Sequence, residues 1–248
     1  MDLDLKNKTV FITGASSGIG AASAHIFSAE GADVIVSYGN NAQGAGQTAA
    51  QVCANGRHAW LCPMDVSAPD HVKAALAALP PEIQGLDALV LCAGLSLHTA
   101  LAEITPEEWQ HVLDVNLNGP FYVLQGLTPL LRDGAAVVLV SSVSAQTGVA
   151  HQAHYAAAKA GLVNLAKSAA RALAPRIRVN CVTPGLTLTP MGQETIAAID
   201  RDYAKNKMLL QRFATPEEVA QVIVFLASPR NSFMTGATVD VNGGRDLR

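Results

Sequence analysis

The sequence predicts an α/β protein, a single-domain, doubly wound parallel sheet of about seven strands with helices on both faces. First, short β-branched runs alternate with segments of helical periodicity along the whole chain, which requires crossovers between parallel strands. Second, 50% of the 248 residues are hydrophobic and 15% are charged, a balance typical of a sheet covered on both faces. Third, no linker, repeat or change of composition divides the chain. We therefore expect one domain over residues 1–248.

The β-branched runs give the expected strands in order. They cover residues 9–13, 33–37, 58–62, 88–92, 136–141, 177–183 and 237–242. Helix starts are marked at Thr105 and Thr215, because each threonine is followed by a proline and, two residues later, by a glutamate that can complete a capping box. Residues 186–211 lack strand patterning and mix polar with apolar side chains, which predicts a mobile helical lid over a substrate site.

Composition and charge exclude several classes of function. The formal net charge of -3 and the scattered Lys and Arg residues give no field that would attract a nucleic acid. No apolar run approaches the roughly 18 to 20 residues of a membrane span. Residues 1–8 are charged rather than apolar, so we expect a cytoplasmic protein with no membrane or nucleic-acid partner. The four cysteines form no C-x-x-C pair and are expected to be buried free thiols.

A glycine-rich turn follows the first expected strand. Gly14, Gly18 and Gly20 lie in the segment Thr-Gly-Ala-Ser-Ser-Gly-Ile-Gly, directly before an Ala-rich helix expected to begin near Ala21. Glycines at these positions allow a tight turn and let a pyrophosphate approach the backbone, while the helix N-terminus supplies free N–H groups. The turn therefore predicts a dinucleotide site in a Rossmann-type fold.

The end of the second strand normally selects the cofactor. An acidic residue there binds the ribose 2′-hydroxyl of NAD, but this chain has Tyr38, flanked by Ser37. No Arg or Lys is present nearby to pair a 2′-phosphate, although the hydroxyls of Ser16, Ser37 and Tyr38 can donate to one. We expect NADP or NAD, with NADP slightly favoured. Asp65 and Val66, after the third strand, are expected to bracket the adenine.

Tyr155 and Lys159 are separated by four residues on an expected helix, so they share one face. A lysine cation at about 4 Å would stabilise a phenolate by about 4 kcal/mol at an effective dielectric constant near 20, enough to lower the tyrosine pKa from about 10 toward 7. Ser142, at the end of the fifth strand, is placed to hold the same oxygen. These residues predict a proton-transfer site for a carbonyl or alcohol substrate.

With these motifs the chain resembles the short-chain dehydrogenases/reductases over nearly its full length, and most closely the 3-oxoacyl-[acyl-carrier-protein] reductases. The resemblance implies Ser142, Tyr155 and Lys159 as catalytic residues, with Asn116 as a fourth that supports a water-linked proton relay to the lysine. It also implies a homotetramer or homodimer. The expected cofactor-binding residues are Gly14, Ser16, Ser17, Gly18, Ile19, Gly20, Ser37, Tyr38, Asp65, Val66, Ala93, Gly94, Tyr155, Lys159, Pro184, Gly185 and Thr189.

The sequence departs from the family at Cys92, where the family usually carries an asparagine. A thiol cannot replace the hydrogen bonds of an amide, so the usual bracing of the central sheet is open to question.

The substrate wall is less well marked. We expect Ser144, Gln146, His151 and Leu186 to line it, with His154 as an alternative to His151. The H-x-x-H pair formed by His151 and His154 is not interpreted as a metal site, because no third ligand lies near it in sequence and the resemblance implies metal-independent chemistry. The remaining histidines are expected in packing or at the surface.

Three functions remain open at this stage. The leading hypothesis is an NAD(P)-dependent oxidoreductase that interconverts a secondary alcohol and a ketone by hydride transfer, similar to 3-oxoacyl-[acyl-carrier-protein] reductases. The first alternative is a sugar or polyol dehydrogenase, and the second is a non-catalytic nucleotide-binding scaffold. Arg132, Arg176 and Arg178 can form a weak basic patch for a carrier protein, although isolated surface charge is the favoured interpretation.

Overall fold

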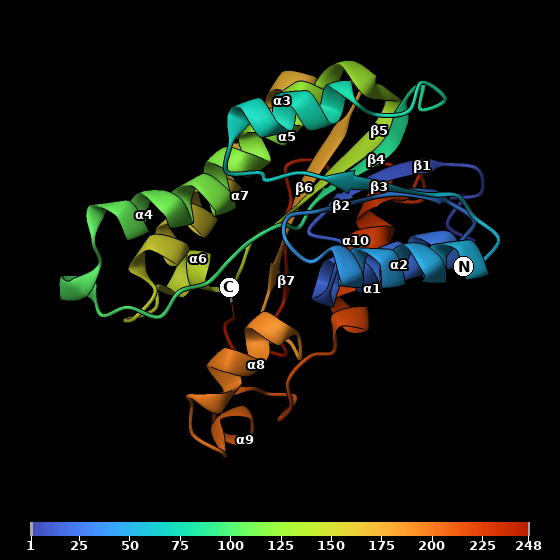
Figure 1. Cartoon of the computed structure of the whole chain (residues 1–248). Helices are drawn as coiled ribbons and strands as arrows, with labels where there is room; N and C mark the ends of the chain where they lie inside the picture. Colours follow the sequence, from blue (N-terminus) through green and yellow to red (C-terminus); the bar gives the residue numbers. More distant parts are fainter. Residues whose placement is uncertain (1, 248) are drawn as a thin grey trace.

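The computed structural model describes residues 2–247, which form one seven-stranded parallel sheet with the order β3-β2-β1-β4-β5-β6-β7 (Figure 1). The order reverses between β1 and β4, so the connection from β3 to β4 passes back across the first strand. The strands are β1 (Thr9–Thr13), β2 (Asp33–Tyr38), β3 (Ala59–Pro63), β4 (Leu86–Leu91), β5 (Leu131–Val140), β6 (Arg178–Pro184) and β7 (Thr238–Val241). The doubly wound fold predicted from the sequence is confirmed.

Helices cover both faces of this sheet. One face packs against α1 (Gly18–Ala29), α2 (Ala42–Ala54) and α10 (Pro216–Ala227). The layer on the other face comprises α3 (Pro69–Ala77), α4 (Pro106–Leu113), α5 (Gly119–Leu127) and α7 (Ala153–Leu173). The shorter elements are η1 (Leu101–Glu103), the π-helix η2 (Asp114–Asn118), η3 (Thr128–Leu130), α6 (Ser144–Thr147), α8 (Pro190–Ala197) and α9 (Tyr203–Lys207).

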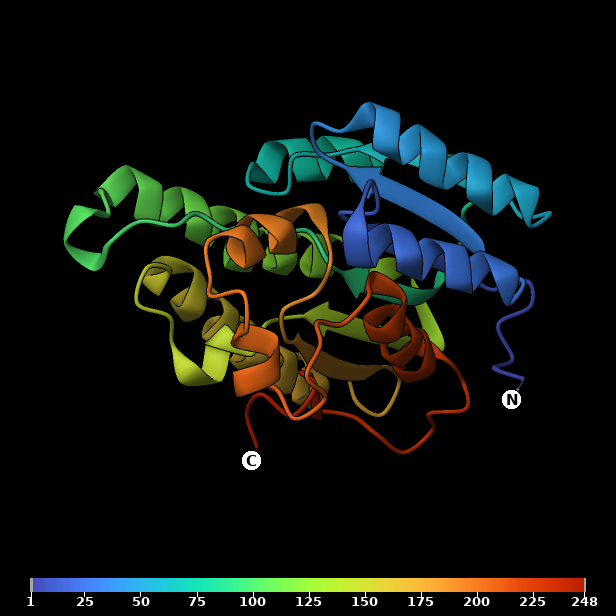
Figure 2. The same ribbon diagram turned by 90° about the horizontal axis from the view of Figure 1, so that it is seen from below.

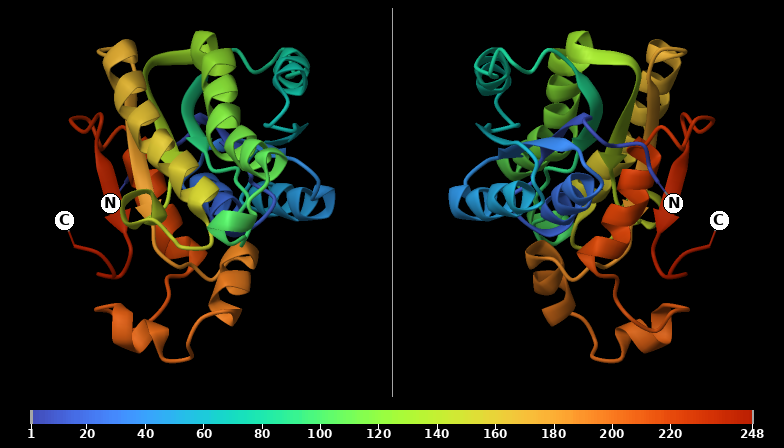
Figure 3. Two further views of the ribbon diagram at one scale, coloured as in Figure 1. Left: turned by 90° about the vertical axis from the view of Figure 1, so that its left-hand side faces the viewer. Right: turned by 90° about the vertical axis from the view of Figure 1, so that its right-hand side faces the viewer.

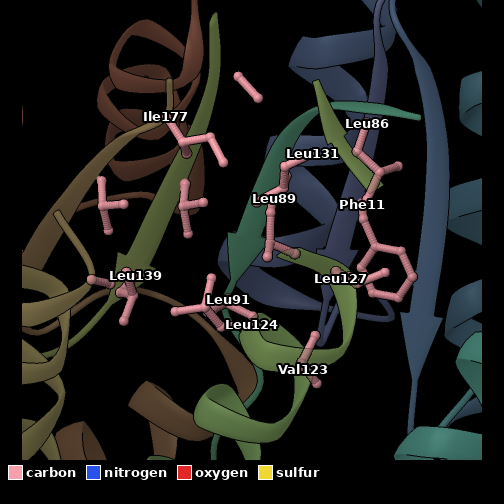
Figure 4. Close-up of a cluster of buried hydrophobic side chains, with 14 of the residues drawn as sticks. Phe11, Leu86, Leu89, Leu91, Val123, Leu124, Leu127, Leu131, Leu139 and Ile177 are labelled. Atoms are coloured by element: carbon pink, nitrogen blue, oxygen red, sulfur yellow. The ribbon is translucent and has the colours of Figure 1, made fainter. Parts of the chain in front are cut away.

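The alternation of side chains along the strands divides the core between the two faces. On β1, Phe11 belongs to the cluster under α5 and α7, whereas Val10 and Ile12 belong to the cluster under α1 and α10. Figure 4 shows part of the first cluster, where Phe11 and Leu127 lie close together between sheet and helix. Both faces of each central strand are therefore buried, as expected for a parallel sheet.

The expected strands match the observed ones apart from shifts at their ends. The largest shift is in β5, which begins at Leu131, five residues before the expected start. Leu131 pairs with Leu86 and Ala136 pairs with Ala88, so the two strands lose register between these pairs. The additional residues 132–134 are exposed and lack apolar alternation, so periodicity does not mark them as strand. Helix α1 begins at Gly18 rather than near Ala21.

Helices α8 and α9 project from the body of the molecule (Figures 1 and 3). Seen from below, they lie across the end of the molecule between the segments that carry α4 and α10 (Figure 2). The base of this projection is fastened by the isolated bridge between Thr187 and Ala214. Within residues 2–247, no helix is both long and apolar enough to cross a membrane.

Candidate active site

A cavity of about 490 Å³ opens at the carboxyl ends of the central strands. It lies where the strand order reverses between β1 and β4, the usual position of a ligand site in an open parallel sheet. Its lining includes all of the residues expected from the sequence to bind the cofactor: Gly14, Ser16, Ser17, Gly18, Ile19, Gly20, Ser37, Tyr38, Asp65, Val66, Ala93, Gly94, Tyr155, Lys159, Pro184, Gly185 and Thr189.

The glycine turn gives this cavity a close backbone wall. Gly14 has φ +66, and a Cβ atom there would lie 2.8 Å from the Cα atom of Ala93. The N-cap residue of α1, Ser17, makes no side-chain capping bond, so the first N–H groups of the helix are left available to an anion. The geometry therefore fits a dinucleotide pyrophosphate.

The junction between β1 and β4 is braced although the chain carries Cys92. The hydroxyl oxygen of Thr13 accepts hydrogen bonds from the backbone N–H groups of Cys92, at 2.9 Å, and Ala93, at 3.0 Å. These bonds tie the ends of the two central strands together beside the cavity. The thiol takes no part in them, and burial raises its pKa to about 11.

The expected cofactor-selecting residues differ in accessibility. Ser37 is 1% exposed and its hydroxyl lies beside the thiol of Cys62, although the residue belongs to the cavity lining. Tyr38 is partly exposed at the rim of the cavity. Asp65 accepts hydrogen bonds from the backbone and the hydroxyl of Ser67, which lower the pKa of its carboxyl and keep it charged.

Ser142, Tyr155 and Lys159 converge on the cavity, as their spacing predicts. Tyr155 and Lys159 lie on successive turns of α7, with the lysine Nζ atom 5.6 Å from the centre of the phenol ring. The ammonium group also donates a hydrogen bond to the carbonyl oxygen of Val140 at 3.0 Å. Ser142 follows β5, and its hydroxyl hydrogen-bonds the phenol of Tyr155. The hydroxyls of Ser142 and Tyr155 are therefore close enough to act on one substrate oxygen, with the lysine ammonium beside the phenol ring.

The expected lowering of the tyrosine pKa is wrong for the protein chain by itself. Burial raises the pKa of Tyr155 to about 12, and the hydrogen bond from Ser142 opposes this rise only in part. Burial also lowers the pKa of Lys159 to about 8. The estimate from the sequence counted the attraction between the two groups and omitted the cost of removing each of them from water.

Asn116 lies behind the cavity rather than in its wall. It is fully buried in the π-helix η2, and its side-chain amide donates to the carbonyl oxygens of Leu95 and Val112, at 2.9 Å each. Its Oδ1 atom accepts a hydrogen bond from the N–H of Leu95 at 3.3 Å. A Cβ atom on Gly94 would lie 2.8 Å from this oxygen and 3.4 Å from Nζ of Lys159. Asn116 therefore fixes the loop that passes in front of the lysine.

Two of the four expected substrate residues line the cavity and two do not. Ser144 and Leu186 are in its wall. Gln146 instead donates a hydrogen bond to Asp240 at 3.0 Å, outside the lining. His151 is exposed, and its carbonyl oxygen accepts the N–H of Thr99. Neither residue is therefore part of the cavity wall.

Sequence reasoning missed a polar cluster that connects the cavity wall to α8. The side-chain amide of Gln152 donates to the Ser96 hydroxyl at 2.6 Å and lies 2.9 Å from Nε2 of His98. The hydroxyl of Thr195, on α8, lies 3.2 Å from the same ring nitrogen. Ser96, Gln152 and Thr195 line the cavity. No local pattern marks these residues, because separate segments of the chain bring them together.

Other expectations about single residues need correction. Cys53 is exposed and Cys92 is only partly buried, so the prediction of four buried thiols is wrong. His154 is fully buried and contacts Glu108, so it is not part of the substrate wall. Arg178 is partly buried and donates to the carbonyl oxygens of Leu226 and Ser228, unlike a surface charge. No group of three or more metal-ligating side chains occurs among residues 2–247.

Comparison with known proteins identifies relatives that match almost the entire chain. The family described as Enoyl-(Acyl carrier protein) reductase matches residues 14–246. The 3-oxoacyl-[acyl-carrier-protein] reductase FabG of Staphylococcus aureus is 36% identical over 244 residues, covering 96% of this chain and 97% of that protein. The enzyme of the same name from Thermotoga maritima is 38% identical over 252 residues, covering 97% and 98% of the two proteins.

Solved structures show the same similarity. A short-chain dehydrogenase/reductase from Brucella melitensis, described as a glucose/ribitol dehydrogenase, superposes with a TM-score of 0.94 at 34% identity and covers 100% of both chains. The angucycline C-6 ketoreductase LanV with bound NADP superposes with a TM-score of 0.90 at 31% identity, covering 98% of this chain and 96% of that chain. The similarity therefore extends over the cavity as well as the sheet.

Proposed function

The chain belongs to the short-chain dehydrogenase/reductase family, and from this we propose that it reduces the ketone of a 3-oxoacyl thioester carried by an acyl carrier protein, with Tyr155 as the proton donor. It is an NAD(P)-dependent oxidoreductase that acts on keto or hydroxyl groups. A sugar or polyol dehydrogenase and a non-catalytic scaffold are not favoured, because the relatives similar in sequence are named as 3-oxoacyl-[acyl-carrier-protein] reductases. The observation that carries the proposal is that Ser142, Tyr155 and Lys159 share one cavity with the glycine turn.

A reduced nicotinamide cofactor, which the glycine turn at Gly14, Gly18 and Gly20 would hold by its pyrophosphate, would supply a hydride for the carbonyl carbon. The hydroxyl of Tyr155 gives its proton to the carbonyl oxygen, and the hydroxyl of Ser142 holds that oxygen by a hydrogen bond. The ammonium group of Lys159, held by Val140, stabilises the phenolate left after proton transfer. Asn116 keeps the loop at Gly94 against the lysine.

The raised pKa of Tyr155 determines which form of the phenol is present in the protein without its cofactor. With a pKa of about 12, the phenol is protonated across the physiological range and therefore always carries a proton to donate. In the reverse direction the same group would have to be ionised first, which the burial disfavours. We therefore expect ketone reduction to be faster than alcohol oxidation near neutral pH.

The test is a cofactor-dependent absorbance change with acetoacetyl-coenzyme A, a small 3-oxoacyl thioester, followed by the same substrate on an acyl carrier protein. Tyr155→Phe should lower kcat by at least about 100-fold, because it removes only the proton donor. Cofactor affinity of this variant, measured by titration, should stay within about threefold of wild type, since the ring remains in place. A variant that reduces the ketone at nearly the wild-type rate would rule out this assignment.

We propose NADP as the preferred cofactor. No carboxylate follows β2 to repel a 2′-phosphate, and the hydroxyls of Ser16 and Tyr38 line the cavity. Tyr38→Asp should weaken NADP binding by at least about tenfold and leave NAD binding less affected, because the new carboxylate repels the phosphate. Calorimetric titration of both cofactors against the wild type and this variant measures the preference. Equal affinities of the wild type and of Tyr38→Asp for NADP would contradict the proposal.

We also propose an oligomeric state and a location for the protein, and a role for residues 186–211. A homotetramer or homodimer is supported by exposed apolar side chains on the outer helices, Trp109 on α4 and Phe121 on α5. We propose a cytoplasmic location for the protein and a substrate-lid role for residues 186–211, whose first part lines the cavity. Light scattering after size-exclusion chromatography measures the molecular mass; a monomer at micromolar concentration would contradict the proposed assembly.

A further inference from the structure

Tyr155 lies in the first turn of α7, where backbone N–H groups have no partner within the helix. The N-cap residue, Gln152, makes no side-chain capping bond, and its amide contacts Ser96 and His98 instead. The N–H of Tyr155 donates to Nδ1 of His154 at 2.8 Å. The imidazole of the preceding residue therefore caps this part of the helix from within.

The other ring nitrogen of His154 connects α7 to α4. Its Nε2 atom lies 2.9 Å from Oε1 of Glu108. Because Nδ1 accepts a backbone N–H, it carries no proton, so the proton is on Nε2 and is donated to the carboxylate. The ring is 0% exposed and Glu108 is 24% exposed. Thr99 also hydrogen-bonds Glu108, so the loop after β4 joins the same contact.

Helix capping alone does not explain the position of Glu108. In α10 the equivalent Glu218 accepts the N–H of Thr215 at 2.9 Å and completes a capping box. In α4 only the forward bond forms, from the N–H of Glu108 to the Thr105 hydroxyl at 3.2 Å. The carboxylate of Glu108 contacts His154 instead, which connects two helices rather than closing one.

We propose that Glu108 and His154 are positioning residues that hold the first turn of α7 and so keep the phenol of Tyr155 aligned for proton transfer. This inference rests on the role proposed above for Tyr155. Neither residue lines the cavity, so the pair acts through the backbone of Tyr155 and touches neither substrate nor cofactor. A small displacement of an aligned proton donor lowers the rate of the chemical step much more than substrate binding.

The kinetic test compares variants of Glu108 that keep or remove the hydrogen-bond acceptor. Glu108→Ala should lower kcat about tenfold and change KM by less than about twofold, because alignment is lost while binding is retained. Glu108→Gln should keep kcat within about twofold of wild type, since its amide oxygen still accepts the Nε2 proton. Glu107→Ala is the matched control, because it removes an exposed carboxylate from the same turn.

The partner is tested in the same way. His154→Phe keeps an aromatic ring but removes both nitrogens, and it should lower kcat as much as Glu108→Ala does. The double variant should show no additional loss, because both changes break one chain of contacts. Cofactor-binding stoichiometry measured by titration distinguishes lost alignment from lost folded protein, and it should be unchanged in every variant.

A spectroscopic measurement tests the geometry without activity. In protein labelled with ¹⁵N at histidine, the resonance that disappears in His154→Phe should show a protonated Nε2 and an unprotonated Nδ1. A proton on Nδ1, or wild-type kcat in Glu108→Ala, would overturn the inference. If Tyr155→Phe is inactive in that case, the proposed function stands; activity of Tyr155→Phe would instead refute the proposed function itself.

Discussion

At the scale of single residues, the site depends on Tyr155 and Lys159, whose pKa values are shifted in opposite directions by their removal from water. Tyr155 has a pKa raised to about 12, so it does not titrate near neutrality. Lys159 has a pKa lowered to about 8 by burial, so it loses its charge first as the pH rises. The loss of activity at alkaline pH should therefore follow the deprotonation of Lys159 rather than that of Tyr155.

This predicts a particular pH profile for ketone reduction. The value of kcat/KM, which reports groups of the free enzyme, should be constant below about pH 7 and fall about tenfold per pH unit above the pKa of Lys159, about 8. Lys159→Met should have a low kcat/KM that does not fall above pH 8, because methionine has no charge to lose. A decline near pH 8 that persists in Lys159→Met would contradict the assignment.

A second prediction concerns Cys62, which is 4% exposed and has a pKa raised by burial from 9.0 to about 11. The folded state holds this proton more tightly, so the thiol stabilises the protein below pH 9 and the contribution is lost as the pH rises toward 11. Between pH 7 and 10 the wild type should lose about 1 kcal/mol more stability than Cys62→Ala.

Urea denaturation at the two pH values provides the measurement. Cys53→Ala is the matched control, because Cys53 is exposed. Its stability should follow the wild type at both pH values. Parallel pH dependence of the wild type and Cys62→Ala would show that burial does not perturb this thiol.

The sequence predicts the cofactor-binding residues better than the substrate-binding ones. The glycine turn and the Tyr-Lys pair are local patterns whose chemistry requires fixed spacing, and their residues line the cavity. Gln146 and His151 do not line the cavity, because their contacts are made with residues distant in sequence: the Gln146 amide donates to Asp240, and the His151 carbonyl accepts the N–H of Thr99. The pKa of Tyr155 could not be predicted, since it depends on burial, which spacing does not determine.

At the scale of elements, the capping box of α10 gives a direct stability prediction. Thr215 and Glu218 cap each other, and Glu218 also forms a bidentate contact with Arg212. Thr215→Ala should lower the free energy of unfolding by about 1 kcal/mol, because the N–H of Glu218 loses its side-chain acceptor. Urea denaturation measures the loss. Exposed Thr147→Ala, which removes no N-cap, should change stability by less than about 0.5 kcal/mol; equal losses would contradict the assigned role of the box.

Helix α8 offers another prediction through its contact with His98. The Thr195 hydroxyl and the amide of Gln152 both reach Nε2 of this histidine, which joins α8 to the opposite wall. His98→Ala should raise KM about threefold to tenfold and change kcat less, because the wall of the substrate site is loosened. His151→Ala, an exposed neighbour of Gln152, is the control. An unchanged KM in His98→Ala would argue against a lid closed by this contact.

Most elements could be predicted because hydrophobic period and capping residues are local signals. The exceptions have nonlocal causes. The first residue of β5, Leu131, pairs with Leu86, and the register then shifts before Ala136 in a way that no pattern in residues 131–135 reveals. The box expected at Thr105 formed only in part, because His154 in a distant segment takes the carboxylate of Glu108.

At the scale of the whole molecule, the amino edge of the sheet is tied together by Asp87. Its carboxylate accepts hydrogen bonds from Lys8 at 3.1 Å, from the backbone N–H of Thr9 at 2.9 Å and from Arg132 at 2.7 Å. The three donors come from the start of β1, the segment before it and the start of β5. Asp87 therefore connects neighbouring strands at the end opposite the cavity.

Asp87→Ala should lower the free energy of unfolding by about 2 kcal/mol, because it leaves a backbone donor and two cations without their acceptor. Asp133→Ala is the matched control: Asp133 is 78% exposed and pairs with Arg176 at the same edge. The control should change stability by less than about 0.5 kcal/mol. Equal effects in urea denaturation would show that Asp87 acts as an ordinary surface charge.

The reversal of strand order also has a consequence for biosynthesis. A ribosome releases β1, β2 and β3 before β4, so one side of β1 has no neighbour until β4 arrives. During that interval the open edge can pair with another nascent chain. The cavity between β1 and β4 also cannot form in the early fragment, because β4 has not yet been translated. A cofactor added during synthesis can therefore stabilise only those nascent chains in which β4 has already been translated.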